Sequence, residues 1–380
     1  MHIADIAIDI PMRGCSNALR MSLKTNGSIA GGYDTIAIIG DGGMASVLSI
    51  LLCEKAQKQK TEEQNTNYEI RTTRYEIRIW GYDHRQLAQI EKRRENKKFL
   101  PRYKLPDSLV FEPDDKRIMA GADLIVSAVP CQFMRPVWAR LREHVPAGVP
   151  IVSVAKGIEN DTLLRPTQIL ADVLYPKLKT AVLSGPTIAD ELARRLPATA
   201  CVAAEDEQFA KTIQQTFSCP WLRVYTNTDV VGVELAGAMK NIIAIAAGII
   251  DGIEAGDNAK AALLSRGLAE ITRLGVAMGA RPATFAGLTG LGDLVTTCIS
   301  PKGRNRSLGE RIGKGQNLEQ AEAATESVVE GVATCKSVVA LAAKYGVEMP
   351  ITQAVYEILF EKKPVHKAIE DLMARQLKSE

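Results

Sequence analysis

The stretch from Thr35 to Gln57, TIAIIGDGGMASVLSILLCEKAQ, decides the fold of the first half of the chain. It begins with a short apolar run, Thr35 to Ile39, of the kind that forms a buried β-strand. A glycine turn follows, and from about Met44 the residue pattern predicts a helix. A strand, a glycine loop and a helix in this order open a strand–loop–helix unit.

Further apolar runs of strand length follow, and helical stretches such as 162–174 lie between them. These strand runs cover residues 75–83, 121–130, 149–157 and 180–186. Short apolar strands that alternate with helices predict an α/β fold, a parallel sheet with helices on both faces. The polar segment at about 57–74 is expected to form an exposed loop inserted between the first helix and the next strand.

After about Asp229 the pattern changes, because long stretches rich in alanine and leucine follow one another and no strand run is seen. These stretches cover residues 230–251, 258–278, 329–345 and 352–360. They predict an all-α helical domain. The expected organisation is therefore an N-terminal extension with little structure at 1–34, the α/β domain at 35–228 and the helical domain at 229–380.

Composition excludes several classes of protein. The 380 residues carry a net charge of +3, which is too small to indicate a nucleic-acid surface. No apolar stretch is long enough to predict a membrane span. The seven cysteines are scattered and the four histidines show no metal-ligand spacing, so we expect free thiols, a cytoplasmic location and no metal site.

The glycine loop predicts a dinucleotide site. Gly40, Gly42 and Ala45 fit the pattern G-x-G-x-x-G/A at the end of a strand and the start of a helix. Glycine lets backbone amides approach a pyrophosphate, and the helix N-terminus adds partial positive charge. A purely structural glycine turn is the alternative. Asp41 is unusual so close to a pyrophosphate, and its side chain is expected to point away.

The sequence does not decide between NAD and NADP. An acidic residue about 20 positions after the glycine loop normally holds the ribose of NAD. Here Asp83 follows at a much greater distance, for which the polar insertion would account. Arg85 would instead suit the 2′-phosphate of NADP.

Lys240 lies inside the almost wholly apolar stretch AGAMKNIIAIAAGI, residues 236–249. Lysine is seldom fully buried unless it is paired. A lysine whose ammonium reaches solvent from a helix end is one interpretation. The other is a lysine in a poorly solvated cleft, where the lowered pKa allows proton transfer near neutral pH.

Four motifs identify a family. They are SGPTIADELARRLPATA (184–200), GAMKNIIAIAAGIIDGIEAGDNAKAALLSRGLAEITRLG (237–275), GLTGLGDLVTTC (287–298) and GRNRSLGERIGKG (303–315). Through them the chain resembles the NAD(P)-dependent glycerol-3-phosphate dehydrogenases of bacterial type, from about Thr35 to the C-terminus apart from the insertion. The resemblance implies an NAD(P)-binding Rossmann domain, a helical substrate-binding domain and a homodimer.

The resemblance also implies an activity, the reversible reduction of dihydroxyacetone phosphate to sn-glycerol 3-phosphate for glycerophospholipid synthesis. Two alternatives remain beside it: a dehydrogenase of another small hydroxy acid, and a non-catalytic nucleotide-binding regulatory homologue. The paired Lys240-Asn241 and Arg304-Asn305 favour a phosphorylated ketone over another hydroxy acid.

The family's functional residues are carried over by motif. Lys240 would be the proton donor and acceptor, and Lys156 and Asp293 would complete the catalytic group. The remaining substrate-side positions are Gly185, Thr187, Asn241, Thr297, Gly303, Arg304 and Asn305. The cofactor-side positions are Gly40, Gly42, Gly43, Met44, Ala45, Tyr82, Lys156, Ala189, Arg304, Val328 and Glu330.

The chain departs from the family pattern mainly in the cofactor domain. Gly43 and Met44 stand where a serine or asparagine and an aromatic residue are usual, and Tyr82 stands where an arginine or histidine is common. Gly303 and Cys131 each replace a common serine. The lysine and substrate motifs are intact, so we expect an active enzyme with altered cofactor affinity.

Overall fold

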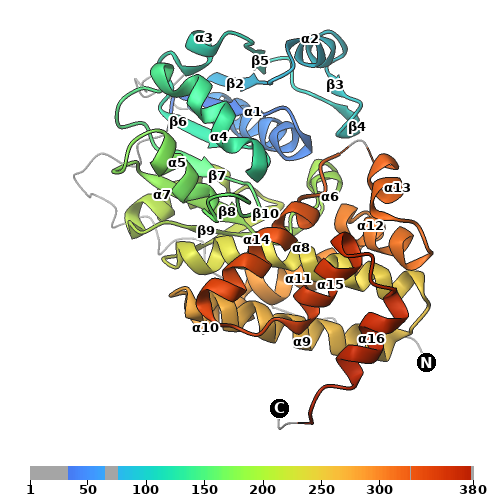
Figure 1. Cartoon of the computed structure of the whole chain (residues 1–380). Helices are drawn as coiled ribbons and strands as arrows, with labels where there is room; N and C mark the ends of the chain where they lie inside the picture. The colour runs from blue at the N-terminus through green and yellow to red at the C-terminus, as the bar shows by residue number, and fades with distance from the viewer. Residues whose placement is uncertain (1–32, 65–75, 326, 378–380) are drawn as a thin grey trace, which may run out of the picture. The chain divides into compact units, whose positions relative to one another are not determined.

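The computed structural model describes residues 33–64, 76–325 and 327–377. The predicted extension at 1–34 lies almost entirely outside the described residues. Within them, an eight-stranded sheet with its helices comes first and a set of helices follows (Figure 1). This is the predicted succession of a Rossmann-type α/β part and an all-α part.

The sheet has the strand order β10-β9-β8-β7-β6-β1-β2-β5. Its strands are β1 (Thr35–Ile39), β2 (Glu76–Trp80), β5 (Val110–Phe111), β6 (Leu124–Ser127), β7 (Ile151–Ser153), β8 (Thr180–Ser184), β9 (Ala198–Ala203) and β10 (Leu222–Asn227). All neighbouring pairs are parallel except β8 and β9, which are antiparallel. The predicted α/β sheet of mostly parallel strands is confirmed, and the β8–β9 pair makes it a mixed one. A short connection through helix α6 (Ala189–Ala193) lets the chain turn back beside β8.

Helices cover both faces of the sheet because strand residues alternate between the faces. Ile36 and Ile38 pack on the side of α1 (Gly43–Gln64), α2 (His84–Arg93) and α7 (Glu207–Phe217). Ala37 and Ile39 pack on the side of α3 (Asp115–Met119), α4 (Cys131–Leu141) and α5 (Pro166–Val173).

Two local predictions are wrong in their boundaries. Helix α1 continues to Gln64, so the first part of the segment at 57–74 is helical rather than a loop, and residues 65–75 lie outside the described part. Glutamine, lysine and glutamate are good helix formers, so a polar sequence does not end a helix. The helix predicted at 162–174 begins only at Pro166, because proline fits the first helical turn.

The helical part (Figure 1) is built around α8 (Val230–Gly252). This helix is buried along nearly its whole length. The further helices are α9 (Asp257–Ala277), α10 (Pro282–Ala286), α11 (Asp293–Ile299), α12 (Arg304–Gly313), α13 (Leu318–Ala323), α14 (Glu330–Tyr345), α15 (Pro350–Phe360) and α16 (Val365–Met373). A 3-10 turn, η1 (Arg142–His144), a π turn, η2 (Leu288–Gly292), and the short hairpin β3 (Glu95–Asn96) and β4 (Leu100–Lys104) complete the elements.

Glycine lets α8 and α12 pack closely. A Cβ at Gly248 would overlap the carbonyl oxygen of Arg306, and one at Gly309 would overlap that of Ile245. Helix α8 is long and apolar enough to cross a membrane, but 94% of the apolar window is buried inside the protein. It is therefore the core helix of the second half.

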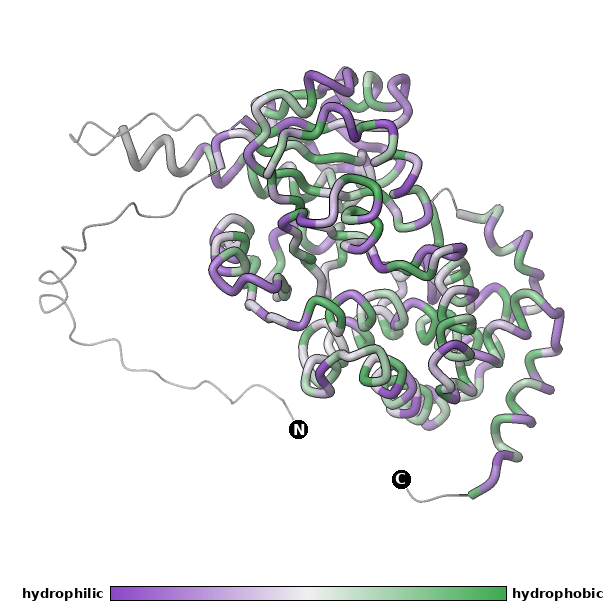
Figure 2. Tube along the Cα trace, turned by 60° about the vertical axis from the view of Figure 1, so that its left-hand side comes forward, coloured by the Kyte–Doolittle hydropathy of each residue, from purple (hydrophilic) through white to green (hydrophobic). Residues whose placement is uncertain are grey.

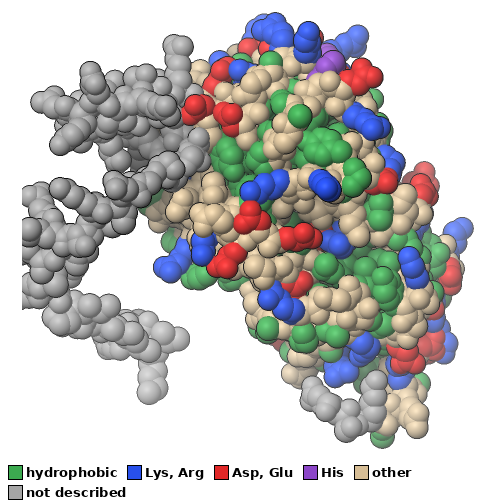
Figure 3. All heavy atoms as spheres, turned by 90° about the vertical axis from the view of Figure 1, so that its left-hand side faces the viewer, with side chains coloured by type: hydrophobic (Ala, Val, Ile, Leu, Met, Phe, Trp, Pro, Cys, Tyr) green, Lys and Arg blue, Asp and Glu red, His purple; other side chains and the backbone are tan. Residues whose placement is uncertain are grey.

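The distribution of side chains agrees with this architecture. Figure 2 shows hydrophobic stretches along the inside of both halves and hydrophilic residues mainly on the outer helices and loops. On the face drawn in Figure 3, basic and acidic side chains are interspersed, in agreement with the small net charge of +3.

Candidate active site

A cavity of about 450 Å³ lies where the carboxyl ends of β1, β6, β7 and β8 face the helical part. The carboxyl ends of parallel strands are where open α/β sheets bind their ligands. Most of the predicted site residues line it: Gly42, Gly43, Met44, Lys156, Thr187, Ala189, Lys240, Asn241, Asp293, Thr297, Gly303, Arg304, Asn305, Val328 and Glu330. Gly40, Ala45, Tyr82 and Gly185 are not among its lining residues.

The glycine loop forms one wall of the cavity. A Cβ at Gly42 would meet nothing within 4 Å, so this position faces open space. A Cβ at Gly43 would lie 2.7 Å from the Phe99 carbonyl oxygen, so a larger residue there would require the Phe99 backbone to move. Gly42 and Gly43 therefore leave an open cradle at the N-terminus of α1, the place where a pyrophosphate fits.

The other two residues of the glycine pattern have packing roles in this structure. A Cβ at Gly40 would lie 2.7 Å from the carbonyl oxygen of Ala128, and Ala45 is fully buried in the core. Buried Asn96 fixes the loop from behind, since its side-chain amide donates to the Asp41 carbonyl oxygen at 2.7 Å and to Ser46 Oγ at 2.9 Å.

A cluster of two lysines and one carboxylate lies across the cavity from this loop. Asp293 Oδ2 lies 2.7 Å from Lys156 Nζ, and Asp293 Oδ1 lies 2.9 Å from Lys240 Nζ. Lys240 also donates to Thr297 Oγ1, which in turn donates to Asp293 Oδ1 at 3.3 Å. Lys156 donates a further hydrogen bond to the Gly185 carbonyl oxygen at 2.9 Å. The structure thus brings together Lys240, Lys156 and Asp293, the three residues carried over as the catalytic group, and places Thr297 beside them.

Burial determines the protonation of Lys240. Its side chain is only 6% exposed, and desolvation lowers its pKa to about 8. The negative charge of Asp293 opposes this shift, whereas the positive charge of Lys156 adds to it. The interpretation of Lys240 as a lysine whose ammonium reaches solvent is therefore wrong, because its ammonium is held inside the cavity wall.

Local structure explains how Lys240 and Asp293 meet. Lys240 lies in the middle of α8, where the surrounding apolar residues bury it against the other helices. The π turn Leu288–Gly292 directly precedes Asp293, which is the first residue of α11. π turns frequently occur at functional sites, and the glycine-rich sequence GLTGLG permits this one.

A chain of amides beside the lysines crosses from α8 to α14. Asn305 Nδ2 donates to Asn241 Oδ1 at 2.9 Å, and the Gly331 backbone N–H donates to Asn305 Oδ1 at 3.0 Å. Asn241 Nδ2 donates to the Lys156 carbonyl oxygen at 3.2 Å. Asn241 and Asn305 therefore hold the cavity wall and orient the backbone of Lys156.

Arg304 gives the cavity an accessible cation at the N-terminus of α12. Its side chain is exposed, and its guanidinium donates to the Val328 carbonyl oxygen at 3.2 Å. Gly303 precedes it as the residue before the helix. The planar guanidinium and the first backbone amides of a helix together suit a phosphate group.

An ion pair that was not predicted from the sequence joins two residues that line the cavity. Lys302 contacts Asp190 Oδ2, and Tyr103 donates to Asp190 Oδ1 at 2.8 Å. The Lys302 hydrogen bond is the main cause of the lowered pKa of Asp190. Asp190 lies within the motif at 184–200, directly after Ala189, and Lys302 directly precedes the motif at 303–315. This position next to assigned residues is the only signal that pointed to them.

Glu330 faces the cavity from the start of α14. Burial raises the pKa of its carboxyl group, and one of its oxygens accepts a hydrogen bond from the Cys131 backbone N–H at 3.1 Å. Cys131 itself is buried at the start of α4, where desolvation raises the pKa of its thiol. The Glu330 contact thus joins the helical part to the loop after β6.

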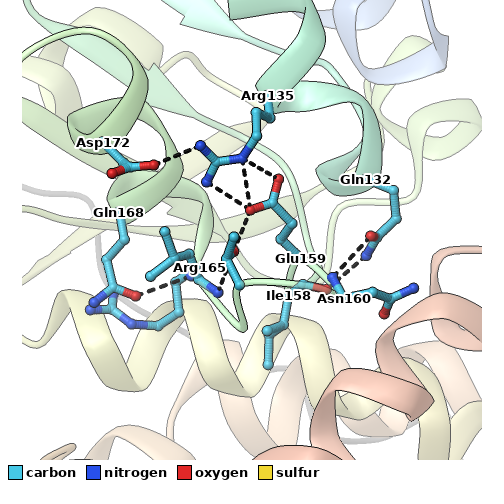
Figure 4. A network of polar contacts seen from close by, with 10 residues as sticks. Gln132, Arg135, Ile158, Glu159, Asn160, Arg165, Gln168 and Asp172 are labelled. Carbon is cyan, nitrogen blue, oxygen red and sulfur yellow. Dashed lines mark hydrogen bonds and ion pairs between the residues drawn. The ribbon is translucent and has the colours of Figure 1, made fainter.

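The loop that follows Lys156 is held by a polar network, shown in Figure 4. Arg135 binds both oxygens of Glu159, with distances of 2.9 to 3.1 Å, and also contacts Asp172 at 2.6 Å. Gln132 donates to the Ile158 carbonyl oxygen at 2.7 Å. These contacts tie the loop to α4 and α5, so the backbone next to Lys156 is fixed.

Tyr82 and Asp83 stand at the end of β2, outside the lining of the main cavity. Tyr82 is 65% exposed, and its ring packs edge-on against Trp80. Asp83 caps α2 and accepts from the backbone N–H groups of Arg85 and Gln86 at 2.9 and 3.2 Å. The Asp83 carboxylate is thus already engaged by the helix that follows it.

Comparisons with known proteins identify the family. The family described as "NAD-dependent glycerol-3-phosphate dehydrogenase N-terminus" matches residues 35–210, and the corresponding C-terminal family matches residues 229–370. The chain belongs to the NAD-dependent glycerol-3-phosphate dehydrogenases. Members of this family are oxidoreductases that act on a CH–OH group with NAD(P).

Individual relatives agree with this assignment. The glycerol-3-phosphate dehydrogenase [NAD(P)+] of Chlorobium phaeobacteroides is 44% identical over 91% of this chain and 98% of its own length. The enzyme of Bacillus pumilus is 48% identical over 78% of this chain and 87% of its own. The crystal structure of glycerol-3-phosphate dehydrogenase from Coxiella burnetii matches with a TM-score of 0.82 and 34% identity, and the match covers 90% of this chain and 99% of that one.

A more distant similarity concerns the fold alone. The D-mandelate dehydrogenase structure is 14% identical to this glycerol-3-phosphate dehydrogenase, with a TM-score of 0.53, and covers 90% of this chain and 100% of its own. The shared fold therefore extends to other dehydrogenases, whereas the sequence match over nearly the whole chain is to the glycerol-3-phosphate enzymes.

Proposed function

We propose that the cavity is the active site in which dihydroxyacetone phosphate is reduced to sn-glycerol 3-phosphate, with Lys240 as the proton donor. One observation carries this proposal: the Lys240 ammonium is buried, lies 2.9 Å from Asp293 Oδ1 and has a pKa lowered to about 8. A lysine with a pKa near the working pH exchanges protons efficiently.

The reaction needs a hydride and a proton. When bound, NAD(P)H supplies the hydride to the carbonyl carbon, and NAD(P)+ takes it back in the reverse direction. Lys240 donates its proton to the carbonyl oxygen as negative charge develops there, so that a hydroxyl group forms and a neutral amine remains. In glycerol 3-phosphate oxidation the same amine removes the hydroxyl proton.

Asp293 and Lys156 prepare this proton transfer. Asp293 accepts from both ammonium groups and favours the charged form of Lys240, which keeps the donor protonated. Lys156 places a second positive charge in the same wall, where it stabilises the developing alkoxide. Thr297 fixes the direction of the Lys240 side chain through its hydroxyl group.

The substrate phosphate is proposed to bind at the N-terminus of α12. Arg304 offers a planar pair of donors, and the backbone from Gly303 to Asn305 offers amide groups at a helix start. Gly185, Thr187 and Asn241 are proposed to complete the substrate side. The Thr187 hydroxyl donates to the Gly185 carbonyl oxygen at 3.1 Å, which orders this loop.

The cofactor is proposed to lie along the glycine loop. Gly42, Gly43 and Met44 would hold the pyrophosphate, because they form the open cradle at the N-terminus of α1. Gly40 and Ala45 support that loop by packing, and Tyr82 would meet the adenosine end. The other proposed cofactor contacts line the same cavity: Lys156, Ala189, Arg304, Val328 and Glu330.

The organisation of the molecule completes the proposal. We place the boundary between the cofactor domain and the helical domain after residue 228, where β10 has ended and Asp229 caps α8. We also propose that the enzyme works as a cytoplasmic homodimer, with no membrane or nucleic-acid partner. This part rests on the family and on the composition of the chain.

A direct assay tests the proposal. Purified enzyme is mixed with NADH or NADPH and either dihydroxyacetone phosphate or unphosphorylated dihydroxyacetone, and the product is identified by chromatography against glycerol 3-phosphate. The proposal predicts cofactor oxidation and glycerol 3-phosphate formation with the phosphorylated ketone and strongly reduced turnover without the phosphate. Equal turnover of both ketones would contradict the proposed phosphate site.

A further inference from the structure

Asp41 lies between the ends of β1 and β2, and the proposed reaction does not use it. It follows Gly40 at the tip of β1, and β1 pairs with β2 in parallel with Ile39 opposite Trp80. The Gly40 backbone N–H donates to the Trp80 carbonyl oxygen at 2.9 Å, so the pairing continues to the ends of both strands. Asp41 is thus held at the tip of β2.

The Asp41 side chain turns toward β2. A Cβ at Gly81 would lie 2.9 Å from the Asp41 carboxyl carbon, so the carboxylate packs directly on the glycine that follows β2. Gln86 Nε2 donates to Asp41 Oδ2 at 2.7 Å and fixes this orientation. A carboxylate accepts up to about four hydrogen bonds, so Gln86 leaves capacity for another donor.

The end of β2 is where Rossmann-type proteins place the acidic residue that binds the ribose 2′-hydroxyl of NAD. Asp83 follows β2 in this chain, but its carboxylate caps α2 through Arg85 and Gln86. Asp41 brings a second carboxylate to the same place from β1. Burial raises the pKa of Asp41, and the nearby negative charge of Asp83 adds to this effect.

We propose that Asp41 is a specificity-determining residue that accepts a hydrogen bond from the adenosine ribose of NAD(H) and repels the 2′-phosphate of NADP(H). The inference rests on the cofactor site proposed above at the glycine loop. A 2′-phosphate carries about two negative charges near neutral pH and would stand beside the two carboxylates. A ribose hydroxyl is neutral and donates to Asp41 instead.

Most of the cationic side chains near the ends of β1 and β2 already contact other groups of the protein. Arg140 binds both oxygens of Asp115 at 2.6 and 2.8 Å and stacks over the Trp80 and Tyr82 rings. His84 Nε2 lies 3.4 Å from Arg140, and Lys98 lies over the Phe99 ring while partly offsetting the charge of Asp41. Arg85 is exposed, and it is the cation to which a 2′-phosphate would turn if the proposal were wrong.

Binding of the reduced dinucleotides tests the proposal without reference to activity. Titration calorimetry gives the Kd of NADH and of NADPH for the wild-type chain, for Asp41→Asn and for Asp41→Ala. Asp41→Asn keeps the shape of the side chain but removes its charge. Asp257→Asn is the control, because it removes the same charge from an exposed position at the start of α9.

We expect the wild-type chain to bind NADH at least about tenfold more tightly than NADPH, the difference made by one charge-assisted contact. Asp41→Asn should reduce this preference about tenfold, chiefly by tightening NADPH binding. Asp41→Ala should in addition weaken NADH binding, and Asp257→Asn should leave both constants unchanged.

Two results would overturn the inference about Asp41 without touching the proposed cofactor site. One is binding of NADPH by the wild-type chain that is as tight as, or tighter than, that of NADH. The other is an unchanged preference for NADH over NADPH in Asp41→Asn. The Gly42→Val variant distinguishes these two results from a failure of the proposed cofactor site itself. Its side chain would enter only the open space at Gly42, so both dinucleotides should bind it far more weakly. Undiminished binding of both by Gly42→Val would overturn the proposed cofactor site and the inference together.

Discussion

Lys240 Nζ lies 2.9 Å from Asp293 Oδ1, and the side chains of the two residues are only 6% and 3% exposed. The second oxygen of the same carboxylate lies 2.7 Å from Lys156 Nζ. One negative charge is therefore shared by two ammonium groups in a poorly solvated wall of the cavity. Burial favours the neutral form of Lys240 and Asp293 favours the charged form, so the balance between them sets when this lysine releases its proton.

The two directions of the reaction should depend on pH in opposite ways. Ketone reduction needs the protonated form of Lys240, so kcat/KM for dihydroxyacetone phosphate should fall as the pH rises through about 8. Alcohol oxidation needs the neutral amine, so kcat/KM for glycerol 3-phosphate should fall as the pH drops through about 8. Initial rates at fixed ionic strength between pH 6 and 10 measure kcat/KM in both directions. If kcat/KM changed with pH in the same way for reduction and oxidation, the role of Lys240 as the proton donor and acceptor would be contradicted.

Removal of the shared carboxylate should change both the acidity of Lys240 and the stability of the fold. Because Asp293 raises the pKa of Lys240, Asp293→Asn should move the pH profile of reduction toward lower pH. It should also destabilise the protein by about 3 kcal/mol, since two nearby ammonium groups lose their partner. Kinetics and urea unfolding measure the two effects.

The exposed Asp107→Asn variant serves as the control for Asp293→Asn. Asp107 pairs with Lys104 on the surface, where an ion pair contributes at most about 1 kcal/mol. The Asp107→Asn variant should therefore leave the pH profile of ketone reduction unchanged. An Asp293→Asn variant with the wild-type profile would show that this carboxylate does not act on Lys240.

Replacement of Arg304 should affect mainly the binding of the phosphorylated substrate. Arg304→Ala removes the planar donors, so KM for dihydroxyacetone phosphate should rise by at least about tenfold while kcat changes less. Arg304→Lys should recover only part of the loss, because a lysine cannot offer paired donors. Arg375→Ala, at an exposed ion pair near the C-terminus, is the control. A wild-type KM in Arg304→Ala would remove this arginine from the phosphate site.

The contact between α8 and α12 should tolerate no side chain at Gly248. A Cβ there would overlap the Arg306 carbonyl oxygen, so Gly248→Ala should destabilise the protein by about 2 kcal/mol, although alanine favours helices by about 1 kcal/mol. Gly42→Ala is the matched comparison, because its Cβ would meet no protein atom. Thermal unfolding with equal stability for both variants would contradict the proposed close packing of the two helices.

Periodicity and turn residues predicted much of the fold. The apolar runs at 35–39, 121–130, 149–157 and 180–186 contain strands of the sheet, and the stretch at 230–251 is nearly coextensive with α8. Strands β9 and β10 were not predicted. The exposed residues of β10 break its apolar pattern, and β9 is rich in alanine, which is uncommon in strands. The antiparallel pairing of β8 with β9 depends on a short tertiary connection that local periodicity does not contain.

The site residues that could be predicted are mainly those that lie in recognisable motifs. Lys240 and Asp293 come from two of the motifs and Lys156 from the end of the apolar run at 149–157, and the structure places both lysines beside the Asp293 carboxylate. The Lys302–Asp190 ion pair was missed because each residue lies just outside the residues that the motifs assign. From its sequence position, the Asp41 side chain is expected only to point away from a pyrophosphate. Its packing against Gly81 shows that it turns toward β2.

Substrate-dependent oxidation of NADH and NADPH by wild-type enzyme and Lys240→Ala tests the central claim most directly, with cofactor binding and thermal unfolding measured on the same samples. Lys344→Ala, an exposed lysine in the last turn of α14, is the control. We predict that Lys240→Ala binds the cofactor and stays folded, but loses about a hundredfold to ten-thousandfold in kcat, the usual contribution of a general acid. Wild-type kcat in the folded Lys240→Ala variant would contradict the proposal that this lysine donates the proton.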